Sequence, residues 1–174
     1  AKSLKNKKDQ DHFKKNQNKT IQLLKKIKNI DIEINHQGKK YFAPKTILNL
    51  RKILKKHPNS KILSGGTDLS LEVTKFRKDI RTIISLNSIN KLNFIKKNKN
   101  LVEIGATTSL FEFQNLIKKY FLDFYNILKR YGSVQIRNVG TIAGNIATAS
   151  PIGDTLPLLL SCLLYTSPSP RDDR

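Results

Sequence analysis

Residues 137–154 read RNVGTIAGNIATASPIGD, a stretch almost free of charge in a chain otherwise crowded with lysine. Small residues dominate it, and at this density they rarely build a helix or a strand of any length. They allow the backbone to approach another group closely and to present N–H groups to it. We therefore interpret the 137–154 stretch as a segment whose backbone contacts a ligand.

A partner for this stretch lies earlier in the chain, where residues 62–70 read ILSGGTDLS. The 62–70 stretch is a short apolar run, then two glycines, then a possible helix start. Such a turn offers converging backbone N–H groups and the positive end of a helix dipole, which can bind a pyrophosphate. Gly66 would allow close approach of the ligand, Thr67 would add a hydroxyl donor, and Asp68 could cap the helix. Together the two stretches indicate a shared ligand that carries phosphate.

The 62–70 stretch matches no common phosphate-binding fingerprint. No G-K-[ST] follows Gly66, so the turn is not a Walker loop, and G-x-G-x-x-G is also absent. A tight turn that binds nothing is therefore the alternative for this stretch taken alone.

The 137–154 stretch carries small residues and hydrogen-bonding groups that suit a buried, neutral heterocycle. A glycine-rich surface loop is the alternative, but it is weakened by Ile142 and Ile146, which both need burial. The groups that could contact the ligand are Gly140, Thr141, Gly144, Asn145, Thr148, Ser150 and Asp154.

The rest of the chain alternates helices with short strands. Thr46 can cap a helix, and Ser109 with Glu112 forms a capping box. The alternation of Ile32 and Ile34 with polar residues predicts a half-buried strand. In chain order we expect a helix at 20–28, a hairpin at 31–42, a helix at 47–56, strands at 61–63 and 82–86, a hairpin at 93–104, and helices from 110 and near 124–131. This order predicts an α+β, α/β-rich domain with a small, mainly parallel sheet and some antiparallel pairing.

Length and composition indicate one domain of the reducing cytoplasm. The 174 residues suffice for a real core. No run of about 18 apolar residues predicts a membrane helix, and the basic N-terminus lacks the apolar region of a signal peptide. Cys162 is the single cysteine of the sequence, so we expect neither an internal disulfide nor a zinc or iron–sulfur site. Because the chain begins at Ala1, we expect a fragment.

The net charge is +20, from 33 Lys and Arg against 13 Asp and Glu. A nucleic-acid-binding surface would explain this charge. An A/T-rich genome would also explain it, because Lys, Asn and Ile all have A/T-rich codons and all three are abundant. The lysines are spread along the chain without the interleaved aromatic residues of a base-stacking platform. We therefore favour codon bias and expect no specific nucleic-acid partner.

The C-terminal tail differs sharply in composition from the rest of the chain. From Cys162 it reads CLLYTSPSPRDDR, which resembles a translated sequencing-library adapter. We therefore divide the chain into a linker or N-terminal extension at 1–30, a partial domain at 31–161 and a non-native tail at 162–174.

Three motifs in this order, ILSGGTDLS, IGATTSL and YGSVQIRNVGTIAGNIATASPIGD, resemble the FAD-binding domain of the molybdenum hydroxylase family. Within the family they are most similar to the small subunit of bacterial xanthine dehydrogenases, and the resemblance covers roughly 41–161. It implies a two-lobed FAD-binding domain of the vanillyl-alcohol oxidase type, truncated at its C-terminal end. Ala143 stands where the family commonly has glycine.

The resemblance also implies which residues contact FAD. The 62–70 stretch would wrap the pyrophosphate, Tyr131 would lie beside the flavin, and Asp154 would be a later acidic contact. The residues implied are Ile62, Leu63, Ser64, Gly65, Gly66, Thr67, Asp68, Leu69, Tyr131, Thr141, Ile142, Ala143, Gly144, Asn145 and Asp154. No catalytic acid or base and no metal ligand is implied, because the flavin carries the redox chemistry.

By this resemblance we expect an FAD-dependent oxidoreductase component that serves purine catabolism. In the family, electrons leave a purine at a molybdenum centre on a partner subunit and travel through iron–sulfur clusters and FAD to NAD. The expected partners are thus a molybdenum-binding large subunit and NAD. Another molybdenum hydroxylase, of the carbon monoxide or aromatic-substrate type, is the alternative within the class. A basic nucleic-acid-binding module is the alternative outside it.

Deletion of residues 162–174 should change the free energy of unfolding by no more than about 0.5 kcal/mol, or raise it, because this tail was not selected to pack here. Thermal melts of the full and shortened chains measure the effect. A marked loss of stability would show that the tail is a genuine element of the domain.

Overall fold

The protein is described by a computed structural model that covers residues 14–27, 30–99, 101–149 and 155–164, the last four of these by backbone alone. The chain divides into two units, 1–30 and 31–174. In the first unit a short 3-10 turn, η1 (Lys14–Asn16), leads into the helix α1 (Gln17–Lys25). The predicted helix at 20–28 is confirmed, although it begins and ends three residues earlier.

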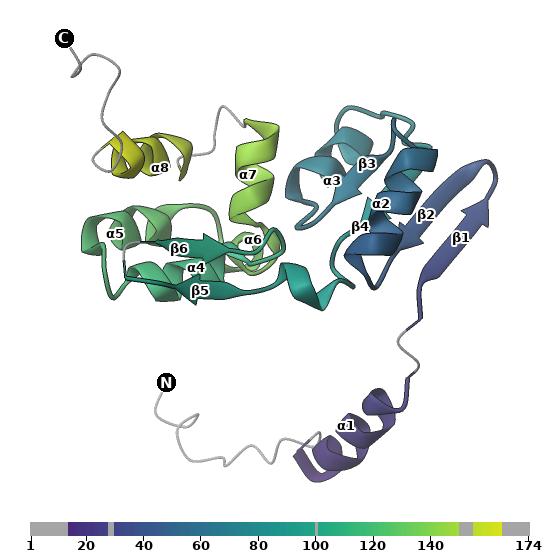
Figure 1. The fold of residues 1–174 in the computed structure, drawn as a ribbon, viewed down its shortest axis with the longest axis horizontal. Coiled ribbons are helices and arrows are strands. Elements are labelled where there is room, and N and C mark those ends of the chain that lie inside the picture. Colours follow the sequence, from purple (N-terminus) through teal and green to yellow (C-terminus); the bar gives the residue numbers. More distant parts are fainter. Residues whose placement is uncertain (1–13, 28–29, 100, 150–154, 165–174) are drawn as a thin grey trace, which may run out of the picture. The chain divides into compact units, whose positions relative to one another are not determined.

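The second unit opens with a four-stranded mixed sheet in the order β1-β2-β4-β3 (Figure 1). Its strands are β1 (Ile32–His36), β2 (Lys39–Ala43), β3 (Lys61–Leu63) and β4 (Thr82–Ser85). β1 pairs with β2 in antiparallel register, whereas β2 and β3 both pair with β4 in parallel. The helix α2 (Ile47–Lys56) follows β2 and α3 (Thr67–Thr74) follows β3. The predicted small sheet, mainly parallel with some antiparallel pairing, is confirmed.

The prediction of a half-buried β1 is wrong. Ile32 and Ile34 are 43% and 53% exposed. β1 is the edge strand and pairs only with β2, so alternation along its sequence does not by itself provide a partner for its apolar face. The hairpin turn is confirmed, with Gln37 and Gly38 both at positive φ.

The chain continues as an antiparallel hairpin followed by a group of helices. The hairpin joins β5 (Ile95–Lys97) to β6 (Val102–Ile104), as predicted, after a 3-10 turn η2 (Asn90–Leu92). The helices are α4 (Leu110–Ile117), α5 (Leu122–Arg130), α6 (Val134–Val139), α7 (Ile142–Thr148) and α8 (Thr155–Leu164). α8 continues past residue 162, where the tail was expected to begin, and residues 165–174 lie outside the described part of the chain.

The two helices α6 and α7 correct the interpretation of the 137–154 stretch as lacking regular structure. Side-chain hydroxyls cap both helices: Ser133 Oγ accepts from Ile136 N at 3.2 Å and Thr141 Oγ1 accepts from Gly144 N at 3.0 Å. These caps satisfy donors at the first turn of each helix, where short helices are least stable. The small residues thus form short capped helices, and Gly140 is the joint between them.

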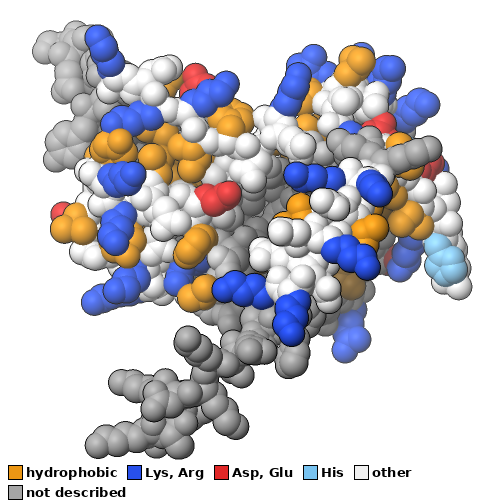
Figure 2. All heavy atoms as spheres, turned by 90° about the horizontal axis from the view of Figure 1, so that it is seen from below, with side chains coloured by type: hydrophobic (Ala, Val, Ile, Leu, Met, Phe, Trp, Pro, Cys, Tyr) orange, Lys and Arg blue, Asp and Glu red, His pale blue; other side chains and the backbone are white. Residues whose placement is uncertain are grey.

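The positive charges are spread over the face that Figure 2 shows. Its Lys and Arg side chains are dispersed among hydrophobic and uncharged groups. Among the described residues, two acidic side chains form ion pairs with lysines: Asp79 with Lys39 at 2.8 Å, and Glu72 with Lys61 and Lys78. The dispersion agrees with the spread of lysine along the sequence.

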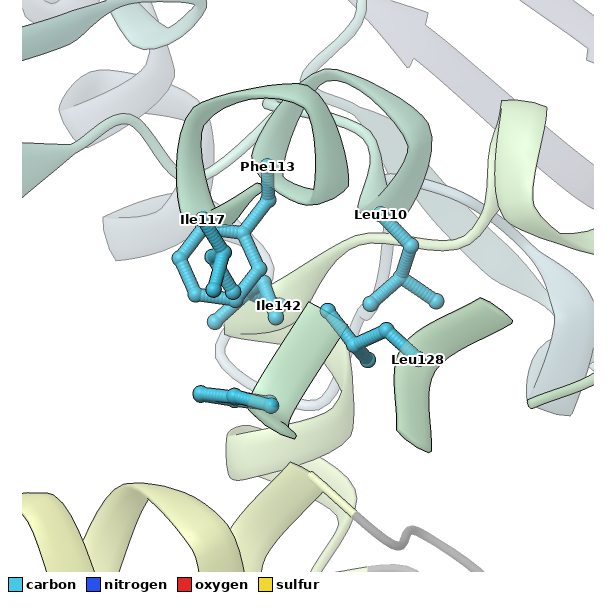
Figure 3. Close-up of a cluster of buried hydrophobic side chains, with 6 residues drawn as sticks. Leu110, Phe113, Ile117, Leu128 and Ile142 are labelled. Atoms are coloured by element: carbon cyan, nitrogen blue, oxygen red, sulfur yellow. The ribbon is translucent and has the colours of Figure 1, made fainter. Parts of the chain in front are cut away.

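A hydrophobic core lies among α4, α5 and α7 (Figure 3). Its buried members are Leu110, Phe113, Ile117, Phe124, Leu128 and Ile142. The Phe113 and Phe124 rings meet edge to face with centroids 5.7 Å apart. The predicted burial of Ile142 is confirmed. That of Ile146 is wrong, because Ile146 is 50% exposed although it follows Ile142 by four residues and lies on the same side of α7.

The capping box predicted from Ser109 and Glu112 is present at the start of α4. Glu112 N donates to Ser109 Oγ at 3.1 Å, and Ser109 N donates to Glu112 Oε2 at 2.9 Å.

Ser109→Ala should lower the free energy of unfolding by about 1 kcal/mol, since it removes the cap of a core helix. Denaturant titration measures it. Ser70→Ala, within α3, is the control and should have little effect. Equal losses in both variants would mean that the cap adds nothing.

Candidate functional site

The two glycine stretches lie against each other. A Cβ atom built on Gly65 would fall 2.3 Å from the carbonyl oxygen of Val139 and 2.8 Å from Cα of Gly140. Both of these are backbone atoms, so they cannot move aside as a side chain could. Gly140 is crowded from its other sides, since a Cβ atom there would fall 3.0 Å from Ile136 O and 3.2 Å from Leu110 Cδ1. Glycine at 65 and 140 therefore allows the backbones of 62–70 and 137–154 to touch.

The second of these stretches is fastened to the core at the same point. Leu110 N donates to Gly140 O at 2.8 Å, and Ser109 forms an isolated antiparallel bridge with Thr141. The start of α4 thus fixes the joint between α6 and α7. The contact between the glycine stretches rests on this fixed joint.

The 62–70 stretch forms the predicted turn from strand to helix. β3 ends at Leu63, and Gly66 is the N-cap of α3 at φ +78°. No side chain caps α3. The N–H groups of its first turn are therefore available to an external acceptor, at the positive end of the helix dipole.

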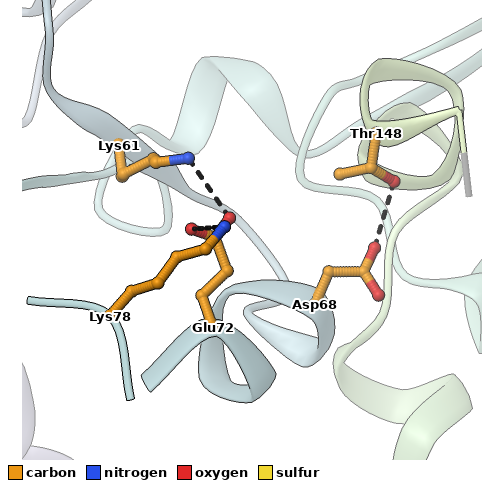
Figure 4. A network of polar contacts seen from close by, with 5 residues as sticks. All are labelled: Lys61, Asp68, Glu72, Lys78 and Thr148. Atoms are coloured by element: carbon orange, nitrogen blue, oxygen red, sulfur yellow. Dashed lines mark hydrogen bonds and ion pairs between the residues drawn. The ribbon is translucent and has the colours of Figure 1, made fainter. Parts of the chain in front are cut away.

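Asp68 was expected to cap α3, and this prediction is wrong. Asp68 lies inside the first turn, and its Oδ2 accepts a hydrogen bond from Thr148 Oγ1 at 3.0 Å (Figure 4). The N-cap position is taken by Gly66, two residues before Asp68, and Asp68 makes no capping hydrogen bond to α3. The bond to Thr148 instead connects α3 to the end of α7, across the two glycine stretches.

A cavity of about 360 Å³ opens between the two stretches. We call it the first cavity. The predicted site residues that line it are Ile62, Ser64, Gly65, Gly66, Thr67, Asp68, Leu69, Thr141, Ala143, Gly144 and Asn145. The structure thus gathers most of the predicted set around one hollow.

A second cavity of about 800 Å³ adjoins the first and shares part of its wall. The shared residues are Gly65, Gly66, Thr67, Asp68 and Asn145. Tyr131, predicted as the aromatic neighbour, lines this second cavity together with apolar side chains of α3 and α6. Both cavities have mixed linings with aliphatic side chains. The first adds the hydroxyls of Thr141 and Thr148, and the second adds the ring of Tyr131.

Two of the predicted site residues that the structure describes, Leu63 and Ile142, line neither cavity. Leu63 lies beneath the turn, where its Cδ1 would be 2.8 Å from a Cβ on Gly66. Ile142 is part of the hydrophobic core. Asp154 lies outside the described residues, so its predicted role stays a prediction.

Thr148, which the sequence analysis gave as a possible ligand contact, lines the first cavity, and so does Ala147, which it did not predict. The sequence analysis did not place Thr148 on a helix. Thr141, Asn145 and Thr148 recur at spacings of four and three, which place them on one face of a helix. The signal was present in the sequence but hidden by the expectation that small residues exclude a helix.

Of the charged side chains that line the first cavity, Lys61 and Glu72 form an ion pair, whereas Asp68 accepts a hydrogen bond from Thr148. Lys61 Nζ lies 3.2 Å from Glu72 Oε1, and Lys78 Nζ lies 3.4 Å from Glu72 Oε2 (Figure 4). The hydrogen bond from Lys61 lowers the pKa of Glu72 below its ordinary value, and the nearby Lys78 charge acts in the same direction. Lys61 is the single cation among the described lining residues of this cavity. An anion there would consequently depend on backbone N–H groups and hydroxyls.

Tyr131 and Asn145 connect the second cavity to the 137–154 stretch. Asn145 Nδ2 donates to the phenol oxygen of Tyr131 at 3.2 Å and lies 3.4 Å from Thr155 Oγ1 of α8. Asn145 is buried, and these bonds fix its amide. Tyr131 is therefore held at the cavity wall by a residue of the second stretch.

The described residues include no cluster of three or more His, Cys, Asp or Glu side chains that could hold a metal ion. None of the described helices has the length and apolar character to cross a membrane.

Residues 33–162 match the protein family described as "FAD binding domain in molybdopterin dehydrogenase". Among curated proteins, the chain is 31% identical over 150 residues to xanthine dehydrogenase 1 of Arabidopsis thaliana, covering 80% of this chain and 11% of that protein. It is 32% identical over 118 residues to the nicotinate dehydrogenase FAD-subunit of Eubacterium barkeri, covering 66% of this chain and 40% of that subunit. The chain therefore spans less than half the length of these relatives.

Solved structures show the same architecture. The reconstituted CO dehydrogenase from Oligotropha carboxidovorans superposes with a TM-score of 0.63 at 28% identity, covering 75% of this chain and 46% of that chain. A Cu,Mo-CO dehydrogenase in its cyanide-inactivated form gives a TM-score of 0.62, also at 28% identity, over 71% of this chain and 44% of that chain. Both superpositions exceed half of this chain, so the fold is shared.

Gly65→Ala should lower the free energy of unfolding by about 1–3 kcal/mol, because its methyl group would force apart two backbones that now touch. Denaturant titration with circular dichroism measures the change. Gly38→Ala is the control: Gly38 has φ +76° and nothing within 4 Å of an added Cβ, so only the backbone cost of about 1 kcal/mol applies. A Gly65→Ala protein as stable as wild type would contradict the contact between the stretches.

Proposed function

The chain belongs to the family of FAD-binding domains of molybdopterin dehydrogenases, and on this premise we propose that its two glycine stretches hold FAD in the paired cavities. The pyrophosphate would lie in the first cavity against the start of α3, and the flavin would lie in the second cavity beside Tyr131. The observation that carries this proposal is the uncapped start of α3, held against the 137–154 stretch by Gly65.

The residues around the first cavity fit a pyrophosphate. A phosphate anion needs several donors and a positive potential, and the exposed N–H groups at the start of α3 supply both. Thr67 and Thr148 add hydroxyls to the lining. The positive φ of Gly66 lets the chain turn into the helix without a side chain at the turn. Binding through backbone groups also suits a cavity whose lysine is already paired.

The second cavity fits the flat, partly apolar ring system of a flavin. Tyr131 offers an aromatic face, while Leu71, Ile136 and Val139 add aliphatic surface. When bound, FAD supplies the redox chemistry, and the chain supplies position and surroundings. We therefore assign to these residues binding and orientation, and no acid or base role.

For the whole protein, we propose a xanthine-dehydrogenase-like molybdenum hydroxylase of the cytoplasm, in which this chain passes electrons from iron–sulfur clusters to NAD. A molybdenum-binding subunit would be its partner. The support is the similarity to xanthine dehydrogenase 1 of Arabidopsis thaliana over most of the chain. We further propose that the fold is the two-lobed type of vanillyl-alcohol oxidase, since the mixed sheet and the helical group lie on either side of the glycine stretches.

A second candidate is the FAD subunit of another molybdenum hydroxylase, with carbon monoxide or an aromatic compound as reductant. The superpositions on CO dehydrogenase and the similarity to a nicotinate dehydrogenase subunit support it. Both candidates make the same use of the paired cavities. The reductant would be bound elsewhere, so the site described here is common to both.

The nucleic-acid-binding alternative has less support. The Lys and Arg side chains are dispersed on the face that Figure 2 shows, and Lys61, the one cation among the described residues that line the first cavity, is paired with Glu72. Binding to DNA through such a surface would be weak, lost at moderate salt and independent of sequence. It would not use the glycine stretches.

Gly66→Val should weaken FAD binding at least tenfold, about 1.4 kcal/mol, because a β-branched side chain at the start of α3 obstructs close approach of the pyrophosphate. Titration with FAD, followed by flavin fluorescence, measures the dissociation constant. Gly38→Val is a matched control, since Gly38 and Gly66 have φ of +76° and +78° and share the same backbone cost. The difference between the two variants therefore reports the site.

Three outcomes would count against the proposal. The wild-type chain could bind no FAD, or folded Gly66→Val could bind it as tightly as Gly38→Val, which would remove the 62–70 stretch from the pyrophosphate site. Sequence-selective DNA binding at physiological salt, measured on the same wild-type sample, would favour the nucleic-acid alternative.

A further inference from the structure

Arg137 is a buried arginine that the sequence analysis did not single out. It lies in α6 and is only 8% exposed. Its Nη1 donates to two consecutive backbone carbonyls, those of Tyr131 at 3.0 Å and Gly132 at 2.6 Å. The guanidinium thus binds the turn that contains Tyr131, the predicted aromatic neighbour of the flavin.

Because this cation is buried, the loss of its hydrogen bonds would cost free energy. A buried charge is costly unless hydrogen bonds compensate it. Among the described residues no carboxylate forms an ion pair with Arg137, and its buried Nε has no hydrogen-bond partner there. The carbonyls of Tyr131 and Gly132 are therefore the compensation that the described structure provides, and breaking either bond would leave the charge poorly satisfied.

The turn whose carbonyls Arg137 binds is short, and its conformation needs an interaction that fixes it. Tyr131 ends α5 in an extended conformation, Gly132 has φ +59°, and Ser133 caps α6. Helices do not determine the conformation of such a junction, because both carbonyls lie outside the regular hydrogen-bond pattern. The planar, multiply donating guanidinium can bind two neighbouring carbonyls at once, which a single ammonium group does with less geometric definition.

Tyr131 is also held at its other end. Its phenol oxygen accepts from Asn145 Nδ2 at 3.2 Å, and Asn145 belongs to the 137–154 stretch. The backbone of Tyr131 is thus fixed by Arg137 and its hydroxyl by Asn145. With both ends fixed, the ring has one orientation at the wall of the second cavity.

We infer that Arg137 is a positioning residue for Tyr131, and that it pre-orients the aromatic wall of the second cavity before a flavin binds. The expected effect on FAD binding rests on the proposed function. The positioning of Tyr131 by Arg137 does not, because it is set without the cofactor. Pre-orientation lowers the ordering cost of binding, so its loss weakens affinity even where no contact to the ligand is removed.

A ligand-free experiment tests the positioning directly. The chain contains five tyrosines, so 3-fluorotyrosine labelling gives a simple ¹⁹F spectrum, in which Tyr131→Phe assigns the Tyr131 signal. Arg137→Met should shift or broaden the Tyr131 signal and leave the other tyrosines unchanged. Arg51→Met, an exposed arginine of α2, is the control and should change none of them. A Tyr131 signal unchanged in Arg137→Met overturns the inference.

A double-mutant cycle with FAD tests the consequence. In the wild-type background Arg137→Met should weaken FAD binding about tenfold, equivalent to about 1.4 kcal/mol. In the Tyr131→Leu background the same substitution should change the dissociation constant by less than about twofold, because Arg137 acts through Tyr131. An equal loss in both backgrounds would show that Arg137 acts independently of Tyr131, and would overturn the inference.

The two arms separate the inference from the proposed function. Absence of FAD binding by the wild-type chain would remove the proposed function, while the ¹⁹F comparison would still decide the positioning of Tyr131. Arg137→Lys covers the case in which Arg137→Met does not fold. Arg137→Lys should shift the Tyr131 signal less than Arg137→Met would. A Tyr131 signal identical to wild type would show that the hydrogen bonds of the guanidinium to the two carbonyls are dispensable.

Discussion

The close contact between Gly65 and the backbone at Val139 and Gly140 is the constraint on which the rest of the site depends. A methyl group at position 65 would lie within 2.3 Å of a carbonyl oxygen, so only glycine permits the approach. The contact joins the turn after β3 to the joint between α6 and α7, which the start of α4 fixes through Gly140 O. Both cavities are consequences of this approach, because each is lined by Gly65 together with residues of the later helices.

The arrangement also explains how a chain with a net charge of +20 can bind an anion without using its lysines. At the first cavity Lys61 is paired with Glu72, and the available donors are the backbone N–H groups of α3 and neighbouring hydroxyls. Backbone donors are fixed in direction by the helix, whereas a lysine side chain must be ordered when it binds. At the proposed site, anion recognition would therefore be separate from the Lys and Arg side chains, which are dispersed on the face that Figure 2 shows.

Much of the fold follows from local sequence signals with a direct physical cause. Gly38 marks the hairpin, Thr46 and Ser109 cap helices, and Gly66 adopts the left-handed conformation at the start of α3. These features act within a few residues, so pattern and propensity suffice to find them. The helices α6 and α7 were missed because hydroxyl caps, rather than the propensities of small residues, stabilise them. With α7 unrecognised, the shared face of Thr141, Asn145 and Thr148 was also missed.

By itself, the sequence determined the order of elements from β1 to α5, the two glycine stretches, the family and most of the predicted residues that line the first cavity. It could do so because turns, caps and motifs are local, so the residues that encode them are close together in the sequence. Tertiary structure alone decided that Asp68 bonds to Thr148 instead of capping α3 and that Ile146 is half exposed. It also decided that Arg137 binds the backbone of the turn at Tyr131. Each of these depends on which surfaces meet after the chain has folded, and a buried cation or a bond between distant residues has no periodicity by which a sequence could reveal it.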